Sequence, residues 1–273
     1  MIPPKILIIA GSDSGGGAGI QADIKAVTML GGHAMTAITA LTAQNTLGVE
    51  AVMTVPVEMV LKQIDVVVSD LGVDAVKIGM IGSPETAEAV AERLAKLDQV
   101  PVVFDPVMVA SSGAELADEA TVAAFRKLIA VSAVVTPNAP ELEVLSGRRI
   151  ENSEDMEAAA LALAREAGIA VLAKGGHVRG AVVVDALVEK DGTVTRWEGP
   201  RVETMNTHGT GCTLASGLAT GLGQTRALAD SATRARDYVK AAIANAPGFG
   251  KGHGPIGHTL GTVPFALIHK IVE

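Results

Sequence analysis

The sequence predicts an α/β fold in which helices cover both faces of a mostly parallel central sheet. Short β-branched runs alternate along the chain with Ala-, Leu- and Glu-rich segments of helical length, which is the pattern of a parallel sheet between two helical layers. Hydrophobic residues make up 48% of the chain, enough for a large buried core. Because no linker, charge block or internal repeat divides the 273 residues, we expect a single domain over residues 1–273.

Apolar runs and turn residues place the individual elements. Strands are expected at Lys5–Ala10, His33–Thr42, Ala75–Ile78, Pro101–Asp105, Ala133–Thr136, Ala170–Lys174, Ala181–Val188 and Thr193–Glu198. The last two should pair antiparallel across Asp191-Gly192, a preferred hairpin turn. Helices are expected at Ile20–Leu30, Pro56–Leu71, Ser83–Leu97, Asp118–Ala130, Ala139–Ser146, Ser153–Ala167, Thr210–Leu222 and Arg226–Asn245. Ser83 followed by Pro84 is a favourable helix start.

One segment does not fit this alternation. Ala40–Val55 reads as an extended arm that turns at Asn45–Gly48, between a strand and a helix where only a short connection is expected. Such an insertion is often a lid or an interface, and an ordinary hairpin at the sheet edge explains it equally well.

Composition excludes several classes of function. The chain has 22 basic and 30 acidic residues and a net charge of −8, with no basic run, so nucleic acid is an unsuitable partner. Apolar runs are too short to cross a bilayer, and the N-terminus lacks the pattern of a signal peptide. The lone cysteine, Cys212, cannot form an internal disulfide. These features predict a soluble, cytoplasmic protein.

Two glycine-rich segments precede helices. Gly11–Gly19 follows the first strand but matches neither GxGxxG nor a P-loop, which would need GxxxxGKS or GxxxxGKT. It could bring backbone N–H groups to a ligand or serve as a flexible turn. In the second segment, Gly209 and Gly211 precede an apolar helix, so successive N–H groups can converge on a phosphoryl group. The helix dipole should lower the pKa of Cys212 and make it partly thiolate; the alternative is a buried, inert cysteine.

Polar residues follow three expected strands. Asp105, Asn138 and Glu141 supply oxygens at the carboxyl ends of strands, where Mg²⁺ could sit with substrate phosphates. Asn138 and Glu141 could equally form a helix cap. Lys174 closes another strand and suits a nucleotide phosphate, or it is a surface lysine. His208 either touches the site or has a structural role, whereas two C-terminal histidines, His253 and His258, lack a third zinc ligand.

Taken together, these segments resemble the ribokinase superfamily, and most closely its hydroxymethylpyrimidine/phosphomethylpyrimidine kinase family. The resemblance rests on AGSDSGGGAGIQAD, TALTAQNT, KIGM, DPVMVASSG, TPNAPE, KGGH, NTHGTGCT and KGHGPIGH. It implies a three-layer sandwich with a small β extension near the substrate. The implied activity is ATP- and Mg²⁺-dependent phosphorylation of 4-amino-5-hydroxymethyl-2-methylpyrimidine to its monophosphate and then its diphosphate, in thiamine biosynthesis, by a homodimer.

The resemblance also implies roles for individual residues. Gly11, Asp23, Gln44, Met80 and Val107 would line the pyrimidine pocket, where the Gln44 carboxamide can answer both an amino group and a ring nitrogen. Asp105, Asn138 and Glu141 would hold the metal, and Lys174, Asn138, Thr207 and His208 would contact ATP. Gly209, Thr210 and Gly211 would form the anion hole, with Lys174 and Cys212 completing the catalytic set.

Two departures concern the lid: Leu47 replaces a more polar residue, and Gly257 stands where the family has Asn. A pyridoxal/pyridoxine kinase and a catalytically inactive pyrimidine-binding regulator are the alternatives.

Overall fold

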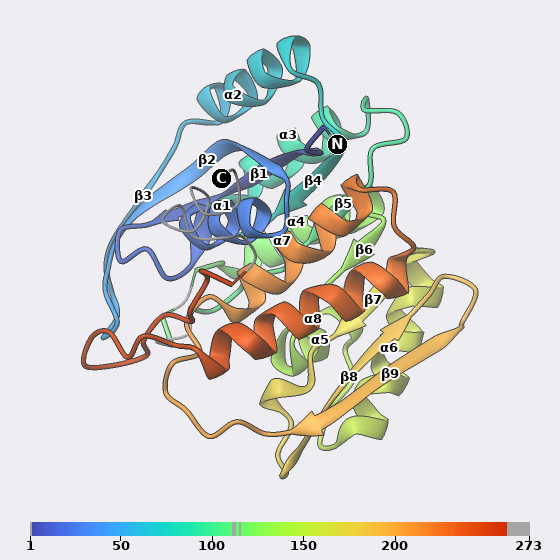
Figure 1. Ribbon diagram of the computed structural model, residues 1–273. Helices are drawn as coiled ribbons and strands as arrows, with labels where there is room; N and C mark the ends of the chain where they lie inside the picture. Colours follow the sequence, from blue (N-terminus) through green and yellow to red (C-terminus); the bar gives the residue numbers. More distant parts are fainter. Residues whose placement is uncertain (1, 111–112, 115, 261–273) are drawn as a thin grey trace, which may run out of the picture.

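A single nine-stranded sheet runs through the molecule in the order β3-β2-β1-β4-β5-β6-β7-β8-β9 (Figure 1). The computed structural model describes residues 2–110, 113–114 and 116–260; Ser111 and Ser112 of the DPVMVASSG segment lie outside them. The strands are β1 Lys5–Asp13, β2 His33–Gln44, β3 Val49–Thr54, β4 Ala75–Ile78, β5 Val102–Phe104, β6 Val134–Val135, β7 Ala170–Ala173, β8 Val182–Val188 and β9 Val194–Pro200. The predicted fold class is therefore confirmed.

The centre of the sheet is parallel and its edges are antiparallel. Strands β1, β2 and β4 to β7 run parallel to one another, whereas β3 pairs antiparallel with β2, and β8 pairs antiparallel with β7 and β9. The β8–β9 hairpin forms where the Asp191-Gly192 turn predicted it. The arm is the β2–β3 hairpin, whose tip is closed by a hydrogen bond from Asn45 N to Gly48 O. Since β3 is an edge strand, the hairpin is in fact at the sheet edge.

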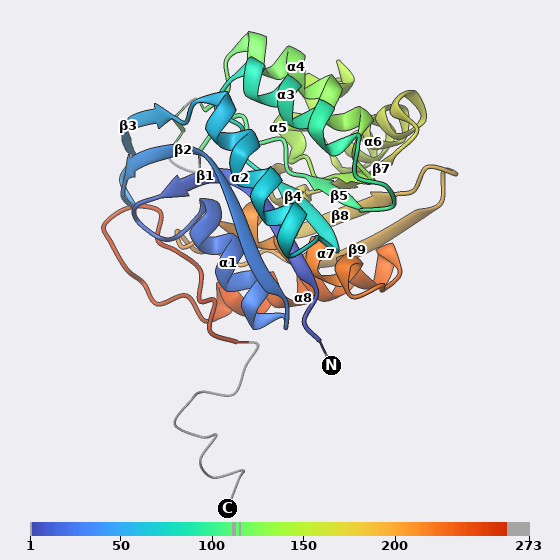
Figure 2. The same ribbon diagram turned by 90° about the horizontal axis from the view of Figure 1, so that it is seen from above.

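Helices cover both faces of the sheet (Figure 2). The helices are α1 Gly19–Met29, α2 Val57–Asp70, α3 Pro84–Leu94, α4 Glu119–Ala130, α5 Ala139–Ser146, α6 Ser153–Ala167, α7 Thr210–Gly223 and α8 Leu228–Ala244. Their bounds lie within three residues of the expected ones. The cap at Ser83 accepts a hydrogen bond from Thr86 N, as its sequence predicts. No helix among the described residues is long and apolar enough to span a bilayer.

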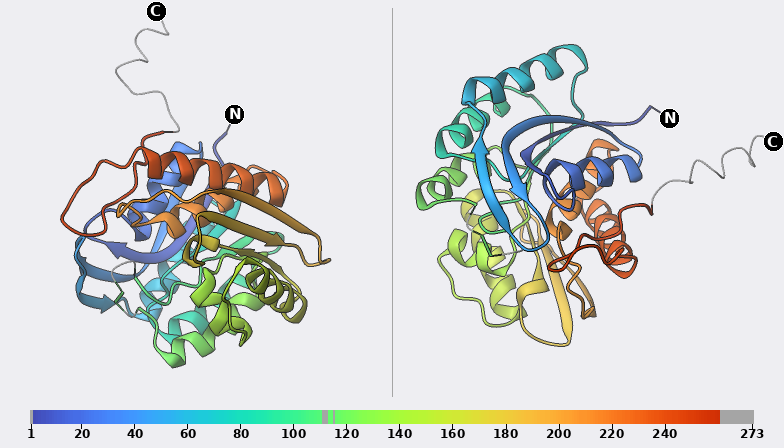
Figure 3. Two further views of the ribbon diagram at one scale, coloured as in Figure 1. Left: turned by 90° about the horizontal axis from the view of Figure 1, so that it is seen from below. Right: turned by 90° about the vertical axis from the view of Figure 1, so that its left-hand side faces the viewer.

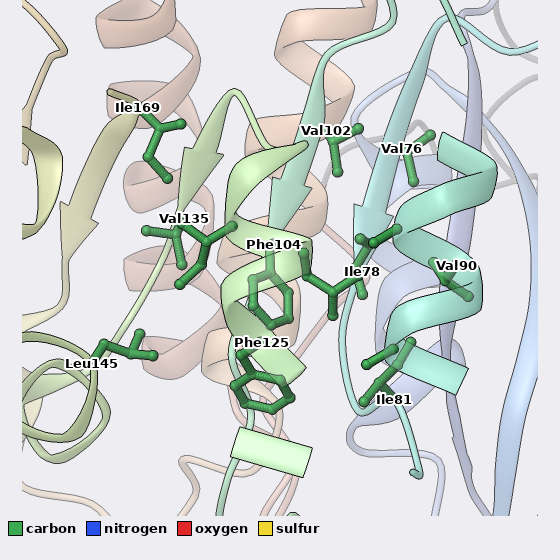
Figure 4. Packing of buried hydrophobic residues seen from close by; sticks show 14 of the residues in the cluster. Val76, Ile78, Ile81, Val90, Val102, Phe104, Phe125, Val135, Leu145 and Ile169 are labelled. Carbon is green, nitrogen blue, oxygen red and sulfur yellow. The ribbon is translucent and has the colours of Figure 1, made fainter. Parts of the chain in front are cut away.

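Alternation along the strands fills two separate cores. Leu7 and Ile9 belong to the core beneath α2 to α6, while Ile6 and Ile8 face α1, α7 and α8. The larger core includes an edge-to-face pair of phenylalanines, Phe104 and Phe125, with ring centroids 5.1 Å apart (Figure 4). The many valine and alanine residues thus pack a two-sided sheet with very few aromatic side chains.

The same alternation carries two charged side chains to the α1/α7 side of the sheet. Val76 and Ile78 of β4 lie in the core beneath α3 and α4, so Lys77 between them points to the opposite face. Phe104 likewise lies in that core, and Asp105 follows it at the end of β5. Lys77 and Asp105 therefore lie on the side of the sheet that α1 and α7 cover, and both line the same cavity as the start of α7.

A C-terminal segment holds the tip of the arm. After α8 the chain returns to the β2–β3 hairpin (Figure 3), where Thr46 Oγ1 accepts from Lys251 N and Gly252 N and Thr46 O accepts from His253 N. His258 Nε2 lies 2.9 Å from Thr213 Oγ1 of α7. The described residues contain no cluster of three or more His, Cys, Asp or Glu side chains suited to a metal.

Candidate active site

A cavity of about 540 Å³ lies at the carboxyl ends of the parallel strands, where open α/β sheets bind their ligands. Most of the residues singled out from the sequence line it. They are Gly11, Gln44, Met80, Asp105, Val107, Asn138, Glu141, Lys174, His208, Gly209, Thr210, Gly211 and Cys212. Asp23 and Thr207 are not among the lining residues.

The start of α7 forms one wall of this cavity. Gly209 precedes the helix with φ +89°, a left-handed conformation, and a Cβ there would overlap the Gly17 carbonyl oxygen. The two glycine segments are therefore in direct backbone contact. Thr207 contributes through its carbonyl, which accepts from Thr210 N. The N–H groups of Gly211 and Cys212 belong to the first turn, whose donors have no partner within the helix, so they can bind an anion.

Next to this helix start, a half-buried lysine bridges two carboxylates. Lys174 Nζ lies 2.7 Å from Asp105 Oδ1 and 3.9 Å from Glu141 Oε2. Asp105 Oδ1 also accepts from Thr136 Oγ1 at 3.0 Å. A Cβ on Gly211 would come within 3.2 Å of Lys174 Nζ, which places the ammonium against the anion-binding turn. The Lys174 side chain is only 15% exposed, so the alternative of a surface lysine is wrong.

Burial and neighbouring charges together set the pKa values of Lys174 and Glu141. Burial disfavours the Lys174 ammonium, but the carboxylates of Asp105 and Glu141 outweigh that effect and raise its pKa. Burial also raises the pKa of Glu141 to about 7, against the favourable field of Lys174. The cluster therefore holds a lysine whose ammonium form is favoured by its neighbours, beside a carboxyl group whose pKa is raised by burial.

Asn138 and Glu141 form a capping box at the start of α5. Glu141 N donates to Asn138 Oδ1 at 3.0 Å, and Asn138 N donates to Glu141 Oε2 at 2.8 Å. The helix-cap alternative is thus present in the structure. Within the capping box only Oε2 of the Glu141 carboxylate accepts a hydrogen bond, and Oε1 takes no part in the box. The box also holds the Glu141 carboxylate close to Lys174.

The Gln44 carboxamide also lines the cavity. Gln44 Oε1 lies 3.1 Å from Thr42 Oγ1, and Gln44 Nε2 lies 3.5 Å from His208 Nε2. A Cβ on Gly11 would meet Met80 Sδ at 3.0 Å, so these two residues lie against each other in the wall. The His208 ring, implied to contact ATP, lies beside Gln44, and its Nε2 is 2.9 Å from the buried Asp13 Oδ2.

Asp13 organises the first glycine loop and was missed from the sequence. Its carboxylate accepts from the backbone N–H groups of Gly15, Gly17 and Ala18. Burial opposes ionisation of Asp13, but the hydrogen bonds from His208 and the backbone lower its pKa below the ordinary value. The sequence did contain a signal for this role. Asp13 directly precedes a run of small residues whose consecutive backbone N–H groups can donate to a carboxylate.

Cys212 lies half-buried in the first turn of α7 and lines the cavity. Burial raises its pKa to about 11, although the Lys77 ammonium and a hydrogen bond from Gly19 N–H act in the opposite direction. The expectation of a thiol made acidic by the helix start is therefore wrong, because the cost of desolvating the thiolate is larger.

Asp23 lies behind the cavity wall rather than in it. It is fully buried, accepts from Ser216 Oγ at 2.7 Å and pairs with Lys77 Nζ at 2.8 Å. Its implied contact with the pyrimidine is thus replaced by a buried ion pair. Lys77 itself lines the cavity and was not singled out, although a lysine in the middle of an apolar strand was visible in the sequence.

Comparison with known proteins agrees with this geometry. A family model described as phosphomethylpyrimidine kinase matches residues 13–257. A hydroxymethylpyrimidine/phosphomethylpyrimidine kinase of Rhizobium meliloti is 46% identical over 92% of this chain and 96% of its own. The thiamine biosynthesis bifunctional protein ThiED of Geobacter sulfurreducens is 47% identical over 94% of this chain, which spans about half (52%) of that relative.

The same fold occurs in a solved structure with a nucleotide analogue. The pyridoxal kinase from Staphylococcus aureus in complex with AMP-PCP superposes with a TM-score of 0.86, at 30% identity and over 95% of both chains. This agreement covers the central sheet and its flanking helices and supports the ribokinase-like arrangement. With the family model spanning most of its length, the chain belongs to the phosphomethylpyrimidine kinase family.

Proposed function

We propose that this protein transfers the γ-phosphoryl group of ATP to the hydroxymethyl group of 4-amino-5-hydroxymethyl-2-methylpyrimidine, and then phosphorylates the monophosphate to the diphosphate for thiamine biosynthesis. The observation that carries the proposal is one cavity that is lined both by the Gln44 carboxamide and by the glycine-rich start of α7. Family membership supports the same reaction. The direct test is phosphate transfer from ATP to the pyrimidine alcohol, to its monophosphate and to pyridoxal.

Catalysis in this proposal consists of positioning and charge stabilisation. Gln44 orients the ring so that its hydroxymethyl group faces α7. The N–H groups of Gly211 and Cys212 bind oxygens of the transferring phosphoryl group, and the Lys174 ammonium offsets its negative charge. Cys212 Sγ accepts the hydroxyl proton as the oxygen attacks phosphorus.

A magnesium ion fits the donor set on the phosphate side. Mg²⁺ is usually held by one or two carboxylates together with waters and substrate phosphates, and Asp105 and Glu141 provide two carboxylates that share Lys174. When bound, the metal would neutralise charge on the nucleotide phosphates. In this proposal Asn138 acts on the metal through the capping box that orients Glu141. His177 and Gly176 also line the phosphate side, and Arg201 fixes their loop by donating to the Gly176 carbonyl.

Replacing Glu141 by glutamine should raise the Mg²⁺ concentration needed for half-maximal activity several-fold. The amide keeps the shape of the side chain but removes one of the two anionic ligands. Binding of the pyrimidine, measured by calorimetry, should be almost unchanged. Glu198→Gln, an exposed charge removal on β9, is the matched control. An unchanged Mg²⁺ titration would leave Glu141 with its capping role alone.

The choice between pyrimidine and pyridoxal is assigned to Gln44. A carboxamide can pair with the adjacent donor and acceptor of an aminopyrimidine, whereas pyridoxal offers a different ring edge. Leaving one buried polar group unpaired costs about 1–3 kcal/mol, or roughly 5- to 150-fold in kcat/KM. Gln44→Leu should therefore raise KM for the pyrimidine and narrow the gap between the two alcohols.

Side-by-side kcat/KM values for both alcohols check this assignment in the wild type and the variant. A wild type that prefers pyridoxal would move the assignment to pyridoxal kinase, the function named for a structural relative at 30% identity. Binding without transfer to either alcohol would favour the inactive regulator, against which the complete set of phosphate-site residues argues.

We also propose that the arm forms a homodimer interface and that residues 1–273 are one domain. The edge strand β3 and the hairpin tip expose Leu47 and Met53, at 65% and 60%, beside unpaired backbone groups of the sheet edge. Sedimentation at micromolar concentration should give a dimer, and Met53→Lys should shift it toward monomer. A monomeric wild type would contradict the proposed interface, and the arm would then have only the proposed role of a lid over the substrate. Cytoplasmic location stays a prediction from the sequence.

A further inference from the structure

One of the residues that line the cavity is a fully buried lysine. Lys77 of β4 is fully buried, yet it lines the cavity together with Cys212. A Cβ on Gly79 would come within 2.7 Å of Lys77 Nζ, so the ammonium is packed against the backbone that follows its own strand. A charged side chain in this position requires a partner, because an isolated buried charge is very costly.

That partner ties the lysine to the helix that carries Cys212. Asp23 of α1 accepts from Lys77 Nζ through Oδ2 and from Ser216 Oγ through Oδ1. Ser216 stands one turn after Cys212 on α7. The Lys77 ammonium is thus fixed between α1 and α7, and Asp23 raises its pKa far enough that it stays charged despite burial.

Charged groups from four elements face Cys212. Lys77 comes from β4, Asp23 from α1, Asp105 from β5 and Lys174 from the end of β7. Gly19 N–H donates to the sulfur. The carboxylates disfavour a negative sulfur and the ammonium groups favour it. Among these charges Lys77 has the largest effect on the thiol, and that effect opposes burial.

We propose that Lys77 is a positioning residue for proton transfer, whose Asp23-held ammonium favours the thiolate form of Cys212 against the effect of burial, so that the sulfur can receive the hydroxyl proton. In the step, the thiolate Sγ takes the proton of the hydroxymethyl O–H and becomes a thiol. The oxygen forms a bond to the γ-phosphorus, and the bond from that phosphorus to the bridging oxygen breaks with its electron pair leaving on ADP. The thiol then returns its proton to solvent. This inference rests on the role proposed above for Cys212.

Alkylation with iodoacetamide tests the inference without substrate. Since Cys212 is the lone cysteine of the chain, the alkylation rate across pH reports its ionisation alone. Lys77→Met should move the midpoint to higher pH by about one unit or more, the size of effect expected from one nearby opposite charge. Asp23→Asn should move the midpoint to lower pH, because it removes a carboxylate and keeps the ammonium. Opposite shifts from the two partners of one ion pair are an electrostatic signature that general loosening does not produce.

An unchanged midpoint in Lys77→Met, or shifts of both variants in the same direction, would overturn the inference. Removing one partner of a buried pair can unfold a protein, so thermal melts accompany each variant. If Lys77→Met is not native, Lys77→Met/Asp23→Leu replaces it, because an apolar pair of similar volume often restores stability. Its midpoint should still lie above that of the wild type, since Lys77 has a larger effect on Cys212 than Asp23 does.

Activity provides a separate readout. In the pH profile of kcat, the limb that rises with pH should move in each variant by the same amount as the alkylation midpoint. If alkylation shifts but Cys212→Ser retains full turnover, the Lys77 effect on the thiol stands and the proton-accepting role of Cys212 is wrong. The two hypotheses therefore fail separately.

Discussion

Replacing Cys212 with serine is expected to lower kcat for phosphate transfer by about 10²-fold or more, the usual size of a lost general base. Serine preserves the bulk of the side chain and the backbone N–H of the first turn of α7, so the anion site stays intact. The serine variant lacks the thiol, whose ionised form the Lys77 ammonium favours. Single-turnover measurement of the chemical step gives the effect directly.

Nucleotide binding separates this effect from damage to the fold. Calorimetric affinity for an ATP analogue should be nearly the same in the Cys212→Ser variant and the wild type, because Lys174 and the glycine backbone are unaltered. A serine variant with close to wild-type turnover would reject proton acceptance by Cys212. The half-buried sulfur would then be a packing group in the cavity wall.

Replacing Gly209 with alanine should reduce kcat by about 10²- to 10³-fold, comparable with removal of a donor from an oxyanion hole. Gly209 has φ +89°, and a Cβ would overlap the Gly17 carbonyl oxygen. To relieve this overlap, the start of α7 must move away from the first glycine loop. The N–H groups of Gly211 and Cys212 would move with it, away from the phosphoryl oxygens.

Gly199→Ala is the matched control for this variant. Gly199 lies in β9, outside the left-handed region, and a Cβ there meets no atom within 4 Å. It should retain wild-type activity and melting temperature. If Gly209→Ala keeps more than about a tenth of wild-type kcat, one order of magnitude or 1.4 kcal/mol, the close contact between the two loops is not needed for catalysis.

Local chemistry in the sequence was enough to predict the fold and several of the residues that line the cavity. Apolar alternation placed the strands because a residue's face depends only on its position along the strand. The caps at Ser83 and Asn138 act within three residues, and the Asp191-Gly192 turn acts between adjacent strands. Asp105 and Lys174 were found because both follow buried strands of one parallel sheet.

Pairing between distant segments was decided by the tertiary structure alone. Asp23 reads as a site residue from its motif, but Lys77, 54 positions away, draws it into a buried ion pair. His208 lies beside Gln44, and Asp13, 195 positions earlier, binds its ring. The ionisation of Cys212 likewise depends on burial and on charges from β4, α1 and β5. Solvent exclusion and the field at an atom are sums over neighbours that only folding brings together, whereas strand periodicity, caps and turns are local properties that the chain order already contains.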